Sequence, residues 1–325
     1  MNRKKGVVNL ELEQHKPKRK KGIGKWFQEF FEQWELQTMV LPGIIFMIIF
    51  NFIPIYGLVI AFQRYTVMDT FSTAEWVGFE NFKIILNDRF FWDSVYNTLG
   101  ISLLKLLIGF VLPIIFAVLI YELRQGPFKK LVQTISYMPY FLSWIVLGGM
   151  LINWLSTTGL LNTILTGLGF QVKNQNYLLS SDNYWWIAVL SDIWKNTGWG
   201  TILYLATLAK IDPAYYEAAK IDGATRFQQI TKITIPMLKG IISLNLILTI
   251  SGLLGSNLDQ TMVLMNSQNQ ARAEVINSYV YRIGIAQGDF SYATAVGLGV
   301  SLVSVTLLVL SNQMTKRLND NTSVL

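Results

Sequence analysis

Long apolar segments alternate with short polar ones along the chain from about residue 36 to its end. A helix needs about twenty consecutive, mostly apolar residues to cross the hydrocarbon core of a bilayer. Six segments meet this requirement and are predicted to span a membrane: residues 41–62, 95–121, 131–155, 185–208, 238–258 and 292–314. The prolines Pro42 and Pro54 in the first segment and Pro139 in the third are expected to bend their helices. The pattern therefore predicts an all-α membrane protein with six transmembrane helices.

The first 35 residues follow a different pattern. Residues 1–21 carry eight lysines and arginines and few apolar residues, which is typical of a disordered cytosolic tail. In residues 22–34, Ile, Trp and Phe recur at helical spacing opposite Lys, Gln and Glu. This spacing predicts an amphipathic helix, either lying in the membrane interface or packed on protein. We therefore divide the chain into a basic tail with an interfacial helix (residues 1–35) and a transmembrane domain (residues 36–325).

The composition agrees with a membrane location, because 52% of the 325 residues are hydrophobic and only 14% are charged. The sequence has no cysteine, which excludes disulfides, thiolate nucleophiles and cysteine metal sites. Its single histidine, His15, lies in the basic tail. Neither a catalytic constellation nor a metal site is therefore predicted, and we expect a protein that is not itself an enzyme.

Lysines and arginines are distributed unevenly between the predicted loops. Of the 27, nineteen fall in the N-terminal region, in residues 122–130, in residues 209–239 and at the C-terminal end. Six fall in the alternate segments, and Lys105 and Lys195 lie inside predicted spans. Because basic residues are retained on the cytoplasmic side, both termini and the loop of residues 212–236 are predicted to be cytoplasmic. The formal net charge of +7 therefore needs no nucleic-acid partner.

Several polar residues interrupt the predicted spans and are expected to face the interior of the helix bundle. Lys105 in the second span is expected to pair or to snorkel rather than to contact cargo. In the fourth span, Asp192 and Lys195 are three residues apart and are expected to neutralise each other. The fifth span carries six hydrogen-bonding side chains: Ser243, Asn245, Thr249, Ser251, Ser256 and Asn257.

The sequence of the polar loop, residues 212–236, predicts two short helices with a break between them. Asp212 can cap the first helix, and Pro213 fits its first position, where no N–H is needed. Gly223 supplies the left-handed residue that ends this helix. Apolar residues at helical spacing then predict the second helix: Phe227, Ile230, Ile233 and Met237.

This loop resembles the EAA loop of the permease subunits of binding-protein-dependent ABC importers. The resemblance is carried by Glu217-Ala218-Ala219, Asp222-Gly223-Ala224, Ile233 and Pro236, with the glycine six residues after the glutamate and the proline thirteen after the glycine. Residues 76–86 and 159–165 also resemble carbohydrate-importing permeases. From residue 36 onward the chain looks like the LplB-type branch of the family, which is related to the maltose permeases.

The resemblance implies the type I ABC importer permease fold in the bacterial cytoplasmic membrane. It also implies that the loop docks in a cleft of a separate ATPase subunit. The residues expected to make that contact are Glu217, Ala218, Ala219, Asp222, Gly223, Ala224 and Phe227. The implied partners are a second homologous permease, two ATPase subunits and an extracellular or lipid-anchored solute-binding protein. This chain has no Walker A phosphate loop, so ATP and Mg²⁺ are expected in the ATPase and no cofactor in this chain.

The expected cargo is an oligosaccharide or polysaccharide fragment. By resemblance to the maltose-type permeases, Trp199 stands where a sugar-stacking aromatic is expected, eighteen residues before Glu217. The residues expected to bind cargo are Asn196, Trp199, Thr249, Leu253, Ser256 and Asn257. Helix packing is the competing explanation for each of them. Three other functions stay open. The chain could import a non-sugar solute with Lys105 or Lys195 as counter-charge, or it could be a membrane-embedded enzyme. It could also be an ion-driven transporter, but the loop of residues 212–236 would then have no function.

Overall fold

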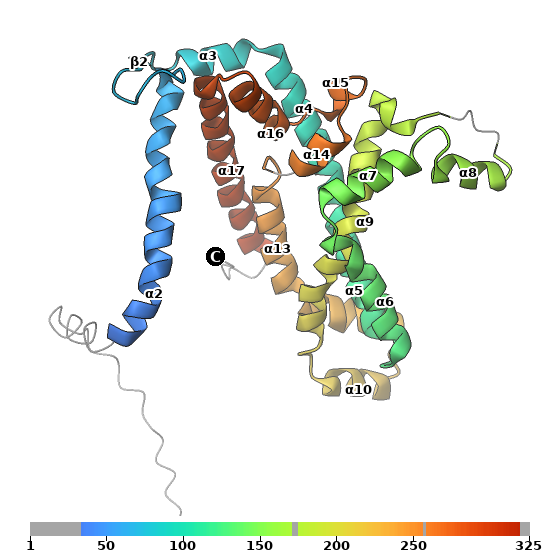
Figure 1. Cartoon of the computed structure of the whole chain (residues 1–325). Coiled ribbons are helices and arrows are strands. Elements are labelled where there is room, and N and C mark those ends of the chain that lie inside the picture. The colour runs from blue at the N-terminus through green and yellow to red at the C-terminus, as the bar shows by residue number, and fades with distance from the viewer. Residues whose placement is uncertain (1–33, 171–174, 256–257, 319–325) are drawn as a thin grey trace, which may run out of the picture. The chain divides into compact units, whose positions relative to one another are not determined.

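The computed structural model describes residues 34–170, 175–255 and 258–318 (Figure 1). The interfacial helix expected in residues 22–34 lies outside this range except for Trp34, as does the basic tail. The chain divides into two units, residues 1–57 and 58–325. In the first unit, α2 (Trp34–Met47) continues through a π-helical turn, η1 (Ile48–Phe52), into a 3-10 segment, η2 (Ile53–Phe62), which ends in the second unit.

The second unit is helical apart from one short antiparallel strand pair. Its first half comprises β1 (Gln63–Arg64), β2 (Glu75–Trp76), α3 (Glu80–Asn87), α4 (Arg89–Leu104), η3 (Lys105–Gly109), α5 (Val111–Glu122), α6 (Pro127–Tyr137), η4 (Met138–Phe141), α7 (Trp144–Trp154), α8 (Leu160–Gly167) and η5 (Tyr177–Leu179). Its second half comprises α9 (Ser181–Leu208), α10 (Pro213–Ile221), α11 (Arg226–Gln229), η6 (Ile230–Thr234), α12 (Ile235–Met237), α13 (Lys239–Ser251), α14 (Leu258–Leu264), α15 (Gln270–Ala273), α16 (Ile276–Tyr281), η7 (Arg282–Ala286) and α17 (Phe290–Leu318).

Three continuous helices in the described part of the chain are long and apolar enough to cross a membrane: Trp34–Phe62, Arg89–Glu122 and Phe290–Thr315. Two bent pairs raise the number to five if each is one span. The predicted fourth span coincides with α9, but its polar residues lower its hydropathy, so it is not counted among them. The helical membrane architecture is confirmed, and the number of six spans stays a prediction.

The third predicted span is broken rather than kinked. The segments Pro127–Phe141 and Trp144–Trp154 meet at an angle of 99°. Pro139 lies in η4, directly before the break, where its missing N–H cannot continue the helical ladder. Ser143 then caps α7 by accepting a hydrogen bond from the Val146 N–H at 3.3 Å. The bend predicted at Pro139 is confirmed, and it is sharper than a kink because the proline and the cap together start a new helix.

Two glycines allow α9 to lie directly against its neighbours. A Cβ atom on Gly198 would stand 1.9 Å from the backbone oxygen of Ser136 in α6. On the opposing helix α4, a Cβ atom on Gly100 would stand 2.3 Å from the ring of Trp185. Helix α9 is therefore held between α4 and α6 at distances that only glycine permits.

The second unit has two ends, which we name after α10 and α3 (Figure 1). At the α10 end, the connection between α5 and α6 lies beside the α10–α11 loop, because Arg226 forms an ion pair with Glu122 at 3.2 Å. Both segments had been predicted to lie on one side of the membrane, and this contact agrees with that prediction.

At the α3 end, Asp88 connects three elements. Its carboxylate caps α4 through the Phe90 N–H at 2.8 Å and accepts hydrogen bonds from the hydroxyls of Tyr279 in α16 and Tyr292 in α17. Burial opposes the charge of Asp88, but these hydrogen bonds hold the pKa of its carboxyl below the usual value. The carboxylate thus stays ionised and holds α4, α16 and α17 together.

We predict that Gly198→Val destabilises the protein. The added side chain would collide with the backbone of α6, and overpacking of this kind costs about 1–3 kcal/mol. The melting temperature of the purified protein should fall by several degrees. Gly297→Val on α17 is the matched control, because nothing lies within 4 Å of a Cβ atom there. Equal melting temperatures for the two variants would contradict the packing described for α9.

Candidate functional site

The α10–α11 loop adopts the geometry that its sequence predicts. Asp212 caps α10 by accepting a hydrogen bond from the Ala214 N–H at 2.9 Å, and Pro213 is the first residue of that helix. Gly223 has a φ of +76°, in the left-handed region. Thr225 and Gln228 then form a capping box that starts α11. The loop is therefore a helix, a glycine turn and a helix, which we call the elbow (residues 212–229).

The elbow exposes apolar side chains next to acidic ones. Ile221 is 87% exposed and Phe227 75% exposed, although both are large apolar residues. Of the residues expected to contact an ATPase, five are exposed and two, Ala219 and Ala224, are half-buried. The exposed five are Glu217, Ala218, Asp222, Gly223 and Phe227. An exposed apolar surface rimmed by charges is typical of a protein-binding site.

Polar contacts connect the elbow to η6 and to the end of α5. The Tyr216 hydroxyl hydrogen-bonds to Thr234 at 3.0 Å, and the Gln229 side chain donates to the Ala224 carbonyl at 3.0 Å. Together with the Arg226–Glu122 ion pair, these contacts hold the elbow as one rigid piece.

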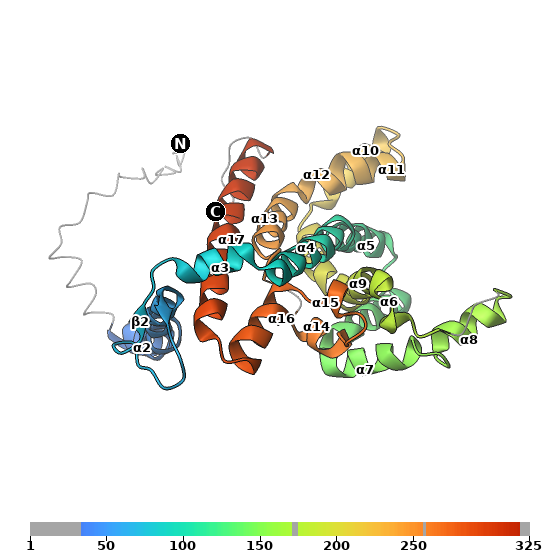
Figure 2. The ribbon, with the colours of Figure 1, turned by 90° about the horizontal axis from the view of Figure 1, so that it is seen from above.

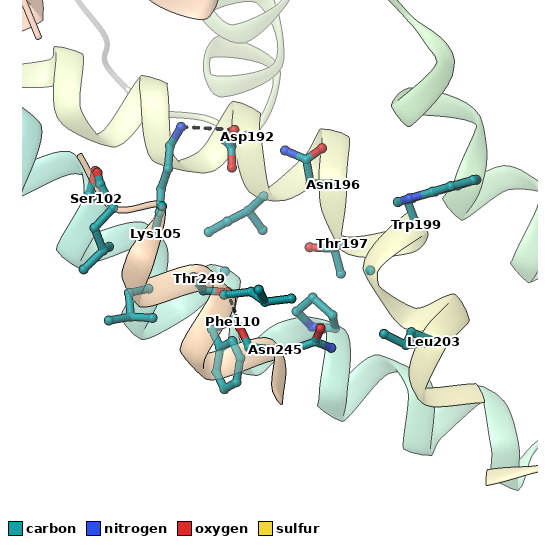
Figure 3. A pocket seen from close by; sticks show the side chains of 18 of the residues that line it. Ser102, Lys105, Phe110, Asp192, Asn196, Thr197, Trp199, Leu203, Asn245 and Thr249 are labelled. Atoms are coloured by element: carbon teal, nitrogen blue, oxygen red, sulfur yellow. Dashed lines mark hydrogen bonds and ion pairs between the residues drawn. The ribbon is translucent and has the colours of Figure 1, made fainter. Parts of the chain in front are cut away.

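A cavity of about 580 Å³ lies between α4, η3, α5, α9 and α13 (Figure 3). It is lined by four of the predicted cargo residues: Asn196, Trp199, Thr249 and Leu253. The other two, Ser256 and Asn257, lie outside the described residues. The lining also includes residues that the sequence analysis had not assigned to cargo: Ser102, Lys105, Phe110, Tyr204 and Asn245. Of these five residues, only Lys105 and Asn245 were predicted to face the interior of the bundle, because they are polar residues inside apolar spans.

Trp199 has an aromatic partner within the chain. Its ring stacks on Tyr140 with a centroid distance of 4.3 Å and an interplanar angle of 3°, and meets the edge of the Phe141 ring at 5.7 Å. It is nonetheless 42% exposed. The break in the third span brings Tyr140 and Phe141 to this position, a contact that no local sequence pattern indicates. One ring face is therefore occupied and fixed by Tyr140. Figure 3 shows Trp199 at one edge of the cavity, apart from most of the other labelled side chains.

Lys105 is paired, as predicted, and its partner is Asp192 (Figure 3). The Lys105 ammonium lies 3.0 Å from the Asp192 carboxylate and donates to the Gln260 side chain at 2.9 Å. Gln260 in turn donates to the Ala188 carbonyl at 2.7 Å and to Ser191 at 2.9 Å. This polar network links α9 to α14 and to η3, the π-helical turn that begins at Lys105. Such turns are frequent at functional sites.

The predicted neutralisation of Asp192 by Lys195 was wrong. The Lys195 ammonium donates to the backbone oxygens of Tyr140, at 2.7 Å, and Leu142. The break in the third span leaves these carbonyls without helical partners, and a buried cation satisfies them. Asp192 is then available to Lys105. In the described residues no cluster of three His, Cys, Asp or Glu side chains could hold a metal ion.

Comparison with known proteins gives a family and several relatives. The profile described as "Binding-protein-dependent transport system inner membrane component" matches residues 109–323. The chain is 37% identical to the polygalacturonan/rhamnogalacturonan transport system permease protein YteP of Bacillus subtilis (strain 168) over 306 residues, 94% of each protein. It is 38% identical to the protein LplB of the same strain over 302 residues, 92% of this chain and 94% of the relative.

Two solved structures are similar over most of their length. One, a bacterial ABC transporter involved in the import of the acidic polysaccharide alginate, gives a TM-score of 0.82 at 33% identity, covering 90% of this chain and 99% of that chain. The other, a bacterial alginate ABC transporter in complex with an alginate pentasaccharide-bound periplasmic protein, gives 0.83 at 32% identity, covering 91% and 98%.

We predict that Lys105→Met and Asp192→Leu each destabilise the protein more than the double variant does. Each single change leaves one charge buried without its partner, which costs about 3–5 kcal/mol, whereas removing both avoids that cost. Thermal unfolding of the three variants measures the difference. A double variant as unstable as the sum of the single variants would show that the pair does not act as a unit.

Proposed function

Because this chain belongs to the family of inner membrane components of binding-protein-dependent transport systems, we propose that it is the permease subunit of an ATP-driven importer of oligosaccharides or polysaccharide fragments. The family match and the relatives confirm the resemblance inferred from the sequence. The observation that carries the proposal is the elbow, an exposed apolar surface on a chain that has no phosphate loop of its own. It supports an energy-supplying partner at the α10 end.

The elbow occupies the connection between two helices that line the cavity. It follows α9 after three residues and leads through η6 and α12 into α13. Asn196 and Trp199 lie on α9, and Thr249 lies on α13. When ATP closes an ATPase dimer around the elbow, α9 and α13 move with it, and the cavity alternates between two packings of the bundle.

The remaining subunits follow from this mechanism. A second homologous permease completes the path, two ATPase subunits bind ATP and Mg²⁺, and a solute-binding protein delivers the cargo to the α3 end. A similar solved transporter is in complex with a periplasmic protein that holds a pentasaccharide, which supports this assembly. The chain itself is then a non-catalytic, multi-pass subunit of the bacterial cytoplasmic membrane, with the α10 end in the cytoplasm. The excess of basic residues near that end supports this orientation.

The cavity suits a sugar. Asn196, Asn245 and Thr249 offer hydrogen-bonding groups without charge, and Trp199 and Phe110 offer aromatic surface for the apolar faces of sugar rings. The two lysines that could serve a charged solute are engaged, Lys105 with Asp192 and Lys195 with backbone carbonyls. A relative named for polygalacturonan and rhamnogalacturonan supports glycan cargo.

We predict that Gly223→Val uncouples ATP hydrolysis from transport. A β-branched residue at a φ of +76° is strained by about 1–3 kcal/mol, so the elbow would change shape. ATP-driven uptake by the assembled importer in liposomes should fall by at least about tenfold, while the bundle stays folded. Gly240→Val, at the start of α13 with open space around its Cβ position, is the matched control. Wild-type uptake by Gly223→Val would count against the coupling role.

We predict that Trp199→Ala weakens uptake without affecting assembly with the ATPase. Loss of an aromatic stacking surface is worth about 0.5–1.5 kcal/mol, equivalent to about a two- to tenfold change in apparent affinity. Uptake at sub-saturating cargo and copurification of the ATPase measure the two effects. Trp186→Ala on the same helix is the control, because Trp186 lines a different cavity. Equal uptake by the two variants would remove Trp199 from the cargo path.

A further inference from the structure

The segment that follows the first predicted span forms a turn with an exposed apolar tip. Strands β1 and β2 pair antiparallel, and residues 65–74 connect them. We call residues 63–76 the hairpin, and Figures 1 and 2 both show it beside α3. At its tip Val67 is 74% exposed and Met68 is 95% exposed. The described part of the chain therefore leaves nearly all of the Met68 surface uncovered.

Hydrogen bonds within the loop hold this turn in one shape. The Asp69 N–H donates to the Thr66 carbonyl at 3.0 Å. The Asp69 carboxylate accepts hydrogen bonds from the Thr66 N–H at 2.9 Å and from the Thr66 hydroxyl at 2.6 Å. Val67 and Met68 are the two central residues of the turn that these bonds close. The apolar pair is therefore presented by a preformed turn, so a partner would lose little conformational entropy by covering it.

The base of the hairpin is bonded to two helices of the second unit. The Tyr65 N–H donates to the hydroxyl of Ser291, at the start of α17, at 2.8 Å. The Asn81 side chain in α3 donates to the carbonyls of Ala61 at 2.9 Å and Gln63 at 3.1 Å. These bonds fix the hairpin relative to α3 and α17.

The hairpin begins where the first candidate span ends. The helix Trp34–Phe62 is long and apolar enough to cross a membrane, and Gln63 directly follows it. The ring of Phe62 stacks on Trp76 with a centroid distance of 5.8 Å and contacts Phe79 edge-on at 5.5 Å. Trp76 is 64% exposed and Phe79 67% exposed. Exposed aromatic rings at the end of a span are typical of the interface between lipid and water.

The charge of the hairpin gives it no attraction to anionic lipid. Residues 63–76 contain one arginine and two acidic residues, so their net charge is −1. The arginine, Arg64, is paired with Glu75 at 3.0 Å. The tip offers a membrane apolar area instead, and the binding of apolar side chains at an interface grows with the area that they bury.

We propose that the hairpin is a membrane anchor in which Val67 and Met68 insert into the lipid headgroup region at the α3 end, with Trp76 and Phe79 at the same interface. The inference goes beyond the proposed transport function, because neither cargo nor ATP takes part in it. Since the base of the hairpin is bonded to α3 and α17, the anchor sets the depth of these two helices in the bilayer.

The test places a single fluorescent label on this cysteine-free chain, at Met68→Cys. The importer, with cysteine-free partner subunits, is reconstituted in nanodiscs of phosphatidylcholine with and without a nitroxide on the lipid headgroup. The nitroxide should quench this label at least about twofold more than a label at Lys83→Cys, because anchored apolar groups lie about 5–10 Å into the headgroup boundary. Lys83 is the matched control, since it is exposed on α3 beside Glu80 and Asn87. Salt should not change the quenching at Met68→Cys, because the contact is apolar.

A second variant tests whether the apolar pair causes the contact. The label is placed at Ser72→Cys, an exposed position in the same loop, and Val67→Ser and Met68→Ser are added. Both serine substitutions leave the backbone and the Asp69 bonds of the turn in place. They should lower the quenching at Ser72→Cys to about the level of the label at Lys83→Cys, because the apolar area of the tip is lost.

Three results would overturn the inference. Equal quenching of the labels at Met68→Cys and Lys83→Cys would place the tip in water. Quenching at Ser72→Cys that survives both serine substitutions would show that the apolar pair does not hold the hairpin at the membrane. A label at Met68→Cys that lipid does not quench, but that the solute-binding protein shields from an aqueous quencher, would make the tip a protein-docking surface.

Discussion

Every polar group inside the bundle needs a partner, since the hydrocarbon core of a membrane offers none. Two lysines show how this constraint shapes the second unit. Lys105 is paired with Asp192 and bonded to Gln260, and these contacts set how α4, η3 and α14 lie on α9. Lys195 is bonded to the carbonyls freed where the third span breaks. The cavity lies next to the first of these contacts, because Lys105 and Asp192 are part of its lining.

The break in the third span links this constraint to the cargo path. It turns the chain by 99° and brings Tyr140 and Phe141 against Trp199. Lys195 stabilises the break from the opposite helix, so α9 supplies both the cation and the aromatic ring of this region. A polar group that satisfies a broken helix therefore also fixes the geometry of a proposed sugar-binding surface.

The helix ends of the elbow could be predicted from the sequence, because the interactions that form them join residues close together in the chain. The cap at Asp212, the proline that follows it and the left-handed Gly223 each act within a few residues, and all three have the predicted geometry. Ion pairs between residues that are distant in the sequence could not be predicted from any local pattern. Asp192 was matched with Lys195 by spacing alone, whereas its partner Lys105 is 87 positions away. Tyr96 and Arg272 are separated still further along the sequence, and no pattern indicated that the Arg272 guanidinium lies over the Tyr96 ring.

We propose that the elbow passes ATP-driven movement to α9 and α13, the two helices that it connects. The sequence contains no cysteine, so Leu203→Cys on α9 and Leu248→Cys on α13, both at the cavity, would be the only sites on this chain that a thiol-reactive spin label modifies. The distance between the labels should be measured in the assembled importer with and without ATP. We expect ATP to shift this distance when the ATPase subunits are present and to have no effect when they are absent. The same distance in both nucleotide states of the full assembly would show that the elbow does not transmit the movement.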